Sequence, residues 1–222
     1  MSQLITIIVF YFLILFSILG YGRIVTVFNS DYQASSFDGL IGISILILIS
    51  FITNLFFPHN FVHNSIVIIF GLFLFIFDLK NNFSNRLKET RLVLLVFSII
   101  FIGILLYKNH DDFYYYHFPY SLILTNFEKI FGLGNLNHGF RTPSSIFYLN
   151  SLFYLPGIKY FLMNSGAIYI FGFVNLRTIY FNHDKIYCKC ICITTNYFKY
   201  IIIVLYSSLG SRSSAEHMYY YI

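Results

Sequence analysis

Charged side chains are scarce in this chain. Asp, Glu, Lys and Arg make up 10% of its 222 residues, whereas soluble domains carry about 25%. Hydrophobic residues reach 58%, and the mean hydropathy is +0.72. A chain of this length would allow one or two soluble domains, but it has too little polar surface to cover them. The composition excludes a water-soluble globule and predicts an all-α, polytopic transmembrane helical protein.

Several sequence motifs are missing as well. The net charge of +5 comes from single basic residues and short basic loops, without the Lys/Arg-rich run of a nucleic-acid patch, so we expect no nucleic-acid partner. Gly132 and Gly134 do not form a nucleotide-binding fingerprint, because no strand precedes them and the GxGxxG spacing is absent. The three cysteines stand together at 188, 190 and 192. They imply no disulfide framework and only weakly indicate a metal site.

Five apolar runs approach the roughly 20 residues that cross a bilayer. They lie at 4–22, 39–57, 61–77, 92–107 and 161–176, and 200–209 is a weaker sixth candidate. The fourth run is short, so we expect Arg91 and Lys108 to snorkel to opposite interfaces. The first run has no basic segment before it and no small-residue cleavage site after it. It is therefore interpreted as a retained helix and not as a signal peptide.

The basic residues predict the orientation, because Lys and Arg concentrate in cytoplasmic loops. The densest basic stretch separates the third and fourth runs and contains Lys80, Arg86, Lys88 and Arg91. Arg23 and the basic residues that follow the fifth run fall on the same side. The N-terminus is then outside, and residues 108–160 form an outer-face loop.

This outer-face loop begins with a polar, aromatic stretch, Asn109-His-Asp-Asp-Phe-Tyr-Tyr-Tyr-His-Phe-Pro119, directly after a charge-free run. Ionisable groups beside a bilayer are costly and mark functional sites by default. Residues 120–131 carry apolar side chains at helical spacing with polar ones between them, which is typical of an interfacial helix. Ser144 or Ser145 can cap a further helix that runs to residue 155.

Three segments of the loop carry a resemblance: Asp112-Phe-Tyr-Tyr-Tyr-His117, Gly132-Leu-Gly-Asn-Leu136 and Ser144-Ser-Ile-Phe147. At this mutual spacing, the chain from about residue 20 to 176 resembles a family of poorly characterised bacterial polytopic membrane proteins of surface-polysaccharide synthesis. That family is similar in layout to the GT-C lipid-linked glycosyltransferases. The resemblance implies a multi-pass protein of the bacterial cytoplasmic (inner) membrane. It also implies transfer of a sugar from a polyprenyl-phosphate donor to a cell-surface glycan acceptor.

The resemblance also implies roles for individual residues. Asp112 occupies the family's acidic position and is the expected general base, since a sugar hydroxyl needs a carboxylate to take its proton. Asp111 is the second catalytic candidate, as a partner of that base or a ligand of a divalent cation. On a helix Asp112 and Tyr116 lie one turn apart. The expected substrate-binding residues are Tyr116, His117, His138 and Arg141, although Arg141 comes later than the family's arginine.

Other interpretations of these residues stay open. Paired aspartates at a helix terminus often cap exposed amides, and His117 and the neighbouring tyrosines suit an interfacial aromatic belt. Arg141 suits an interface anchor. The alternative function is a non-catalytic membrane scaffold, a transport component or an inactive truncated paralogue. Because the spans contain almost no ionisable side chains, a transporter is less favoured than an enzyme.

The sequence divides into two parts. Residues 1–176 form the transmembrane domain with its outer-face loop, and residues 177–222 form an atypical tail in which the pattern of span and loop is lost. The tail holds the possible sixth span. We hypothesise that it is the frameshifted end of an N-terminal fragment. Translation of the gene in its other two frames tests this, because a true frameshift would extend the membrane pattern in one of them.

The orientation is testable by thiol labelling. With the native cysteines replaced by serine, Asn109→Cys should react with a membrane-impermeant thiol reagent in intact cells, because residue 109 follows the fourth span on the outer face. Asn82→Cys, in the basic stretch, should react only after the cells are opened. Labelling of residue 82 but not of residue 109 in intact cells would overturn the orientation.

Overall fold

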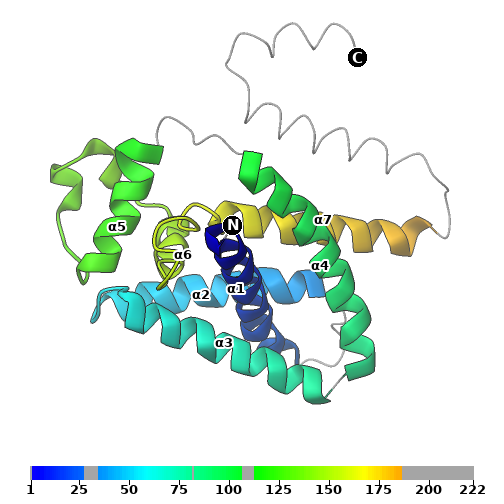
Figure 1. The fold of residues 1–222 in the computed structure, drawn as a ribbon. Coiled ribbons are helices and arrows are strands. Elements are labelled where there is room, and N and C mark those ends of the chain that lie inside the picture. Colours follow the sequence, from blue (N-terminus) through cyan, green and yellow to red (C-terminus); the bar gives the residue numbers. More distant parts are fainter. Residues whose placement is uncertain (1, 28–34, 82, 107–112, 187–222) are drawn as a thin grey trace, which may run out of the picture.

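The structure is a computed structural model that describes residues 2–27, 35–81, 83–106 and 113–186. These residues form helices and turns, with no β-strand among them, as the all-α prediction requires. The helices are α1 (Ser2–Val27), α2 (Ser35–Asn54), α3 (Phe61–Asn81), α4 (Phe83–Leu106), α5 (Phe118–Asn126), α6 (Ser145–Leu152) and α7 (Gly166–Ile186). Figure 1 shows α1 in the middle, with α2, α3, α4 and α7 around it and α5 and α6 at one side.

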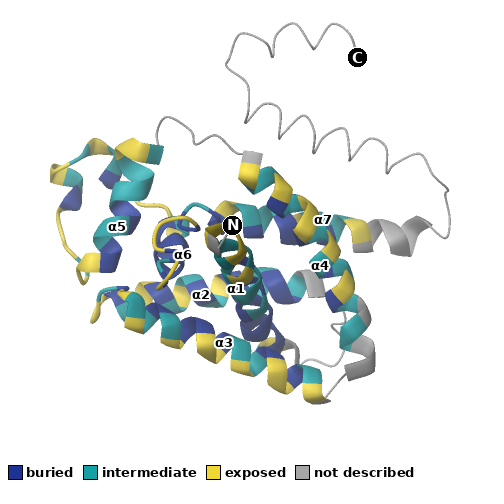
Figure 2. Cartoon of the chain, viewed as in Figure 1, coloured by how far each residue is buried: buried dark blue, intermediate teal, exposed yellow. Residues whose placement is uncertain are grey.

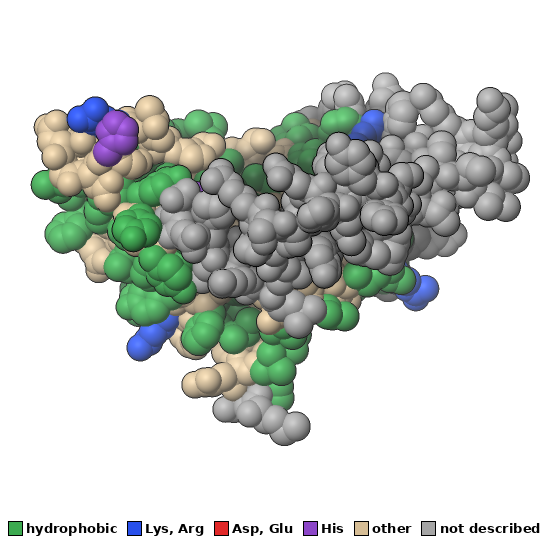
Figure 3. Space-filling model, turned by 90° about the horizontal axis from the view of Figure 1, so that it is seen from above, with side chains coloured by type: hydrophobic (Ala, Val, Ile, Leu, Met, Phe, Trp, Pro, Cys, Tyr) green, Lys and Arg blue, Asp and Glu red, His purple; other side chains and the backbone are tan. Residues whose placement is uncertain are grey.

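The first three helices have the dimensions of membrane spans. The segments Gln3–Val25, Phe37–Asn54 and Phe61–Lys80 are long and apolar enough to cross a bilayer. Their outward surfaces are apolar too, as expected of helices that face lipid. On α3 the exposed large side chains are Val62, Ile66, Ile69, Phe70, Phe73, Ile76 and Phe77. Figure 2 marks this exposed stripe along α3 in yellow, and Figure 3 shows hydrophobic side chains over much of the described surface seen from above.

Helix α1 packs against α2 and α3 at very short range. A Cβ atom added to Gly20 would lie 1.9 Å from the carbonyl oxygen of Gly71 in α3, and one added to Gly42 in α2 would lie 1.9 Å from that of Ile18. Small residues at helix crossings let backbones approach in this way and gain van der Waals contact. On the far side of α1, Tyr11 stacks on Tyr169 of α7 with ring centroids 5.2 Å apart.

Two of the predicted spans differ from the helices observed. The run 92–107 belongs to α4, which already begins at Phe83, so Arg86 and Arg91 lie on a helix and not in a loop. The run 161–176 is helical only from Gly166, whose backbone N–H donates to Asn150 Oδ1 at 3.0 Å. Residues before it form turns after Gly157, which has a φ of 92°. The sixth candidate at 200–209 lies outside the described residues.

The two predicted loop helices are shorter than expected. Ser144 caps α6 as predicted, with its side chain accepting a hydrogen bond from the Ile146 N–H, but the helix ends at Leu152 rather than at residue 155. Helix α5 ends at Asn126 rather than at residue 131. The reason is a competing partner: the Lys129 N–H donates to the Asn54 carbonyl of α2 at 2.8 Å. This bond draws the chain out of the helical path.

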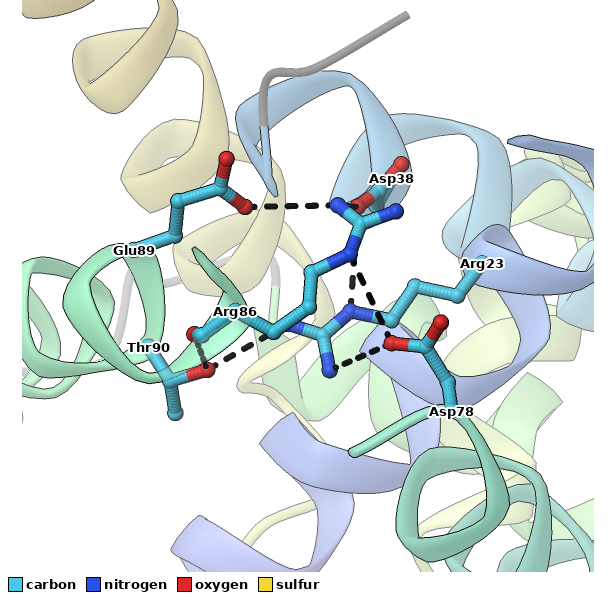
Figure 4. Close-up of polar contacts among 6 residues, drawn as sticks. All are labelled: Arg23, Asp38, Asp78, Arg86, Glu89 and Thr90. Atoms are coloured by element: carbon cyan, nitrogen blue, oxygen red, sulfur yellow. Dashed lines mark hydrogen bonds and ion pairs between the residues drawn. The ribbon is translucent and has the colours of Figure 1, made fainter. Parts of the chain in front are cut away.

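A charged cluster joins four helices at one end of the molecule (Figure 4). It consists of Arg23 (α1), Asp38 (α2), Asp78 (α3), and Arg86 and Glu89 (α4). Arg23 Nη1 lies 3.2 Å from Asp78 Oδ2 and Nε lies 3.7 Å from Asp38 Oδ2. Arg86 approaches the same two carboxylates at 3.3 and 3.6 Å.

The centre of the charged cluster is closed to solvent, whereas Arg86 and Glu89 at its edge are 13% and 20% exposed. The Arg23 and Asp38 side chains are each 1% exposed. Thr90 Oγ1 accepts a hydrogen bond from Arg23 Nη2 at 3.3 Å and donates to the Arg86 carbonyl at 2.7 Å. Charges removed from water carry a desolvation penalty that only close partners offset. Each helix end therefore depends on charges supplied by the others.

Loss of one member of the charged cluster should destabilise the fold. Arg23→Gln leaves buried Asp38 and Asp78 short of a cation, and removal of one partner of a buried pair costs about 3–5 kcal/mol. Arg91→Gln, on the exposed side of α4, is the matched control. Thermal unfolding of the purified protein in detergent checks both variants. Equal melting temperatures for Arg23→Gln and the native protein would show that the cluster contributes nothing.

Candidate functional site

Residues 113–155 form a small unit, here called the cap, at the end of the molecule where α2 ends and α3 begins (Figure 1). The cap has a core cluster of its own, whereas its last part, with Leu149, Leu152, Phe153 and Leu155, packs into the core of the long helices. The cap's own cluster comprises Tyr120, Leu124, Leu133, Phe140, Phe147 and Tyr148. The predicted site residues that the structure describes all belong to the cap.

The structure brings two predicted site segments together. Tyr116 and His117 end a π-helical turn, Phe113–His117, and a Cβ atom added to Gly139 would lie 2.7 Å from the Tyr116 Cβ. Only a glycine lets the segment His138–Phe140 approach so closely. The His117 ring lies 4.3 Å from that of Tyr116 and 5.1 Å from that of Phe147, measured between centroids. Tyr116 and His117 thus lie on one aromatic surface next to His138.

The remaining predicted residues have separate positions. His138 and Arg141 are exposed, and Arg141 packs over Gly134, where an added Cβ would lie 3.0 Å from its Cγ. Asp111 and Asp112 lie outside the described residues. Tyr116 belongs to a π-helical turn, Phe113–His117, and the spacing expected between Asp112 and Tyr116 stays a prediction.

A buried histidine that the sequence analysis did not single out anchors the cap. His59 follows Pro58 in the turn between α2 and α3 and is 0% exposed. Its Nε2 lies 3.1 Å from the Ser50 carbonyl, which only accepts, so Nε2 carries the proton. Its Nδ1 lies 2.6 Å from Ser151 Oγ on α6, and its backbone N–H donates to the Leu124 carbonyl of α5 at 2.9 Å.

Asn64 completes this junction. Its side-chain amide donates to the carbonyls of His59, Ser151 and Tyr154 at 2.8, 2.8 and 2.9 Å. The turn, α3 and the end of α6 are thereby joined by one buried group. A single histidine or asparagine has no sequence period, so only the proline and the flanking polar residues hint at such a junction.

Burial lowers the pKa of His59 to about 3, and the His63 ring stacked 4.9 Å away acts in the same direction. A base desolvated in this way stays neutral at physiological pH. His59 is therefore a structural residue that fixes the cap, and it is not poised for proton transfer at neutral pH.

A lysine and two tyrosines form a second polar group in the cap. Lys129 Nζ donates a hydrogen bond to Tyr148 Oη. Tyr148 Oη lies 3.5 Å from Tyr120 Oη. Burial, followed by the hydrogen bond to Tyr148, raises the pKa of Tyr120 above its ordinary value. Both phenols are buried and Lys129 is partly exposed, so the lysine is the part of this group that a ligand can reach.

The described residues contain no group of three or more His, Cys, Asp or Glu side chains placed to hold a metal ion. Asp111, the candidate ligand of a divalent cation, lies outside them. Comparisons with protein-family models, curated proteins and solved structures find no match for this chain. The resemblance to proteins of surface-polysaccharide synthesis stays a prediction.

The junction at His59 predicts a pH dependence of stability. The pKa of His59 is lowered to about 3 in the folded protein from 6.5, so its contribution is complete above pH 6.5. It falls as the pH drops, because only the unfolded chain takes up the proton. His59→Gln should have a lower melting temperature at pH 7. Between pH 6.5 and pH 4, its free energy of unfolding should fall less steeply than that of the native protein, by up to about 1.4 kcal/mol per pH unit.

Thermal unfolding across this pH range measures the difference. The comparison is between variant and native protein, because the carboxylates that also titrate are common to both. His138→Gln changes an exposed imidazole and serves as the control. Parallel pH profiles for His59→Gln and the native protein would contradict the structural role assigned to His59.

Proposed function

We propose that this chain is a multi-pass protein of the bacterial cytoplasmic membrane that moves a sugar from a polyprenyl-phosphate donor to a cell-surface glycan acceptor. The membrane assignment is supported by three helices of spanning length and apolar composition. In the proposed orientation the charged cluster lies at the cytoplasmic ends of α1 to α3, and the cap lies on the outer face. Lys80 and Arg91, both exposed, then face the cytoplasm.

One observation carries the enzymatic proposal: the packing of Tyr116 against Gly139. The site residues that the resemblance implies include Tyr116 and His138, which are 22 residues apart in the sequence, and this contact packs Tyr116 against the residue that follows His138. A loop serving only as a connector has no need of a core of its own. The cap has such a core and is attached to the long helices through the junction at His59.

The chemistry proposed at this place is a displacement. The acceptor hydroxyl oxygen forms a bond to the anomeric carbon, and the bond from that carbon to the phosphate oxygen breaks. Asp112 takes the hydroxyl proton as general base, and the phosphate leaves with both bonding electrons on its lipid. The developing charge on the phosphate requires a cation nearby. Tyr114 and Tyr115, 66% and 73% exposed, offer ring faces to a sugar.

A specific observation favours the alternative of a transport component. The argument against it was that the spans lack ionisable side chains. Arg23, Asp38 and Asp78 nevertheless lie within the three apolar segments and are buried there. Buried ionisable groups in spans are common along transport pathways. This alternative predicts that substitutions in the cap leave glycan assembly unchanged.

Substitution of the paired carboxylates tests the proposal. Asp112→Asn should abolish glycan transfer, because the amide cannot accept the hydroxyl proton. Asp111→Asn should reduce transfer, and Glu128→Gln, which alters an exposed carboxylate of the cap, should leave it nearly unchanged. The surface-glycan profile of the intact host is the readout, with membrane levels of each variant measured alongside. If all three variants give the native surface-glycan profile at native membrane levels, Asp112 is not a catalytic residue.

A further inference from the structure

Lys129 is held in place by both its backbone and its side chain. Its backbone N–H donates to the Asn54 carbonyl at 2.8 Å. The Asn54 side-chain amide in turn donates to the Leu124 and Phe127 carbonyls at 3.4 and 3.3 Å. The segment that follows α5 is thus fixed to the last residue of α2, and Lys129 stands where the long helices meet the cap.

The ammonium group of Lys129 lies between aromatic rings. Nζ is 5.6 Å from the centroid of the Phe51 ring and 5.1 Å from that of the Tyr148 ring, and it donates to Tyr148 Oη. Ring faces attract a cation at this range. An ammonium carries three donors, and Tyr148 uses one of them. Lys129 therefore has donors left for a ligand while its position is already set.

Lys129 is a partly buried cation without a carboxylate partner among the described residues, whereas the other basic residues near the site are exposed. The ion pairs among the described residues belong to Arg23 and Arg86, and none of the described carboxylates pairs with Lys129. His138 and Arg141 are exposed, so a ligand must order them at a cost of about 0.5–1.5 kcal/mol for each such side chain. A partly buried, pre-positioned cation that lacks a carboxylate partner favours an anion.

An apolar groove runs along α2 toward this cation. It is lined by Phe37, Leu40, Ile41, Ser44, Ile45 and Leu48. Leu48 and Phe51 are 58% and 46% exposed, and at three residues apart they share one face of the helix. The Phe51 ring is one of the two rings beside Lys129 Nζ. From residue 37 to residue 48 the helix rises about 17 Å, so this apolar, open surface matches part of a long hydrocarbon chain.

We propose that Lys129 binds the phosphate of a lipid-linked polyprenyl phosphate whose chain lies in the α2 groove. This inference rests on the proposed function, which supplies the polyprenyl phosphate as donor carrier. Lysine binds phosphate as a point charge, and the groove matches the hydrocarbon part of the same molecule. Tyr148 is a positioning residue: its hydroxyl and ring hold the ammonium toward the place where the phosphate arrives.

Direct binding to the purified full-length protein in detergent tests the site, with a radiolabelled polyprenyl phosphate as the probe. Lys129→Gln should weaken binding at least tenfold, and Lys129→Arg should retain most of it. Tyr148→Phe should weaken binding by a smaller factor, because the rings remain. Lys80→Gln, an exposed lysine at the opposite end of the molecule, should change nothing. Binding by Lys129→Gln within twofold of the native value, with an unaltered melting temperature, would overturn the proposal.

Competition experiments separate the sources of phosphate. Unlabelled polyprenyl phosphate should displace the probe, whereas inorganic phosphate and the uncharged polyprenol should displace it poorly, because each supplies only half of the contacts. Ser44→Phe places a ring at an exposed position of the groove and should weaken binding of the polyprenyl phosphate. Equal displacement by phosphatidylglycerol vesicles would identify a general headgroup site and refute the polyprenyl assignment.

The binding assay is independent of transfer. If polyprenyl phosphate binding depends on Lys129 while Asp112→Asn leaves the surface glycans intact, the glycosyltransferase proposal fails and the lipid-phosphate site stands. If Asp112→Asn abolishes transfer while Lys129→Gln binds polyprenyl phosphate as well as the native protein does, only the assignment of Lys129 fails. If Lys129→Gln does not fold, Lys129→Arg and Ser44→Phe decide the question. If Ser44→Phe folds normally and changes polyprenyl phosphate binding by twofold or less, the groove does not hold the hydrocarbon chain.

Discussion

The amide of Asn64 donates hydrogen bonds to three carbonyls from two separate stretches of the chain, at His59 and at Ser151 and Tyr154. A buried carbonyl that loses its partner carries a desolvation penalty of about 1–3 kcal/mol, so these bonds are constraints as much as attractions. They decide where α6 lies on the turn between α2 and α3. The orientation of the cap, and with it the aromatic surface at Tyr116 and His117, follows from this junction.

The opposite end of the molecule is organised by a different interaction. At the charged cluster the helices are held by Arg23, Asp38 and Asp78, which are buried, and by Arg86 and Glu89, which are partly exposed. Such ion pairs add little net stability over a well-packed apolar core. Because each buried charge needs its partner close by, however, the helices can pack in few other ways. The hydrogen-bonded junction therefore sets the cap, and the charged cluster sets the angles of the long helices beneath it.

Much of the helical layout follows from the sequence because it depends on local properties. Helix α3 begins at Phe61, where the third apolar run was predicted to begin, three residues after Pro58, and Ser144 is the one of the two predicted serines that caps α6. The end of α5 was not predictable in this way, since it is set by the carbonyl of Asn54, which is 75 residues before Lys129. Likewise, Arg23 gives a topology signal in the sequence, and only the fold shows that Asp38 and Asp78 surround it.

In the candidate site, too, some features follow from local sequence and others depend on partners far away in the chain. The aromatic pair Tyr116 and His117 and the glycine segment after it are recognisable as sequence patterns, and their contact through Gly139 is a property of the fold. His59 has ordinary sequence surroundings. Its importance comes from its burial and from its partner on α6, which no local pattern records.

The burial of Arg23 has a consequence for how the chain is made. Arg23 lies in the first apolar segment, whereas its partners Asp38 and Asp78 lie in the second and third. A nascent α1 therefore emerges from the ribosome with a guanidinium that has no carboxylate to meet. On insertion scales an arginine costs about 2.5–3.5 kcal/mol at the centre of a spanning helix, whereas one near the helix end extends its side chain to the interface. The end of α1 is then expected to wait at the lipid headgroups until α3 is translated, which makes α1 to α3 a single unit of co-translational assembly.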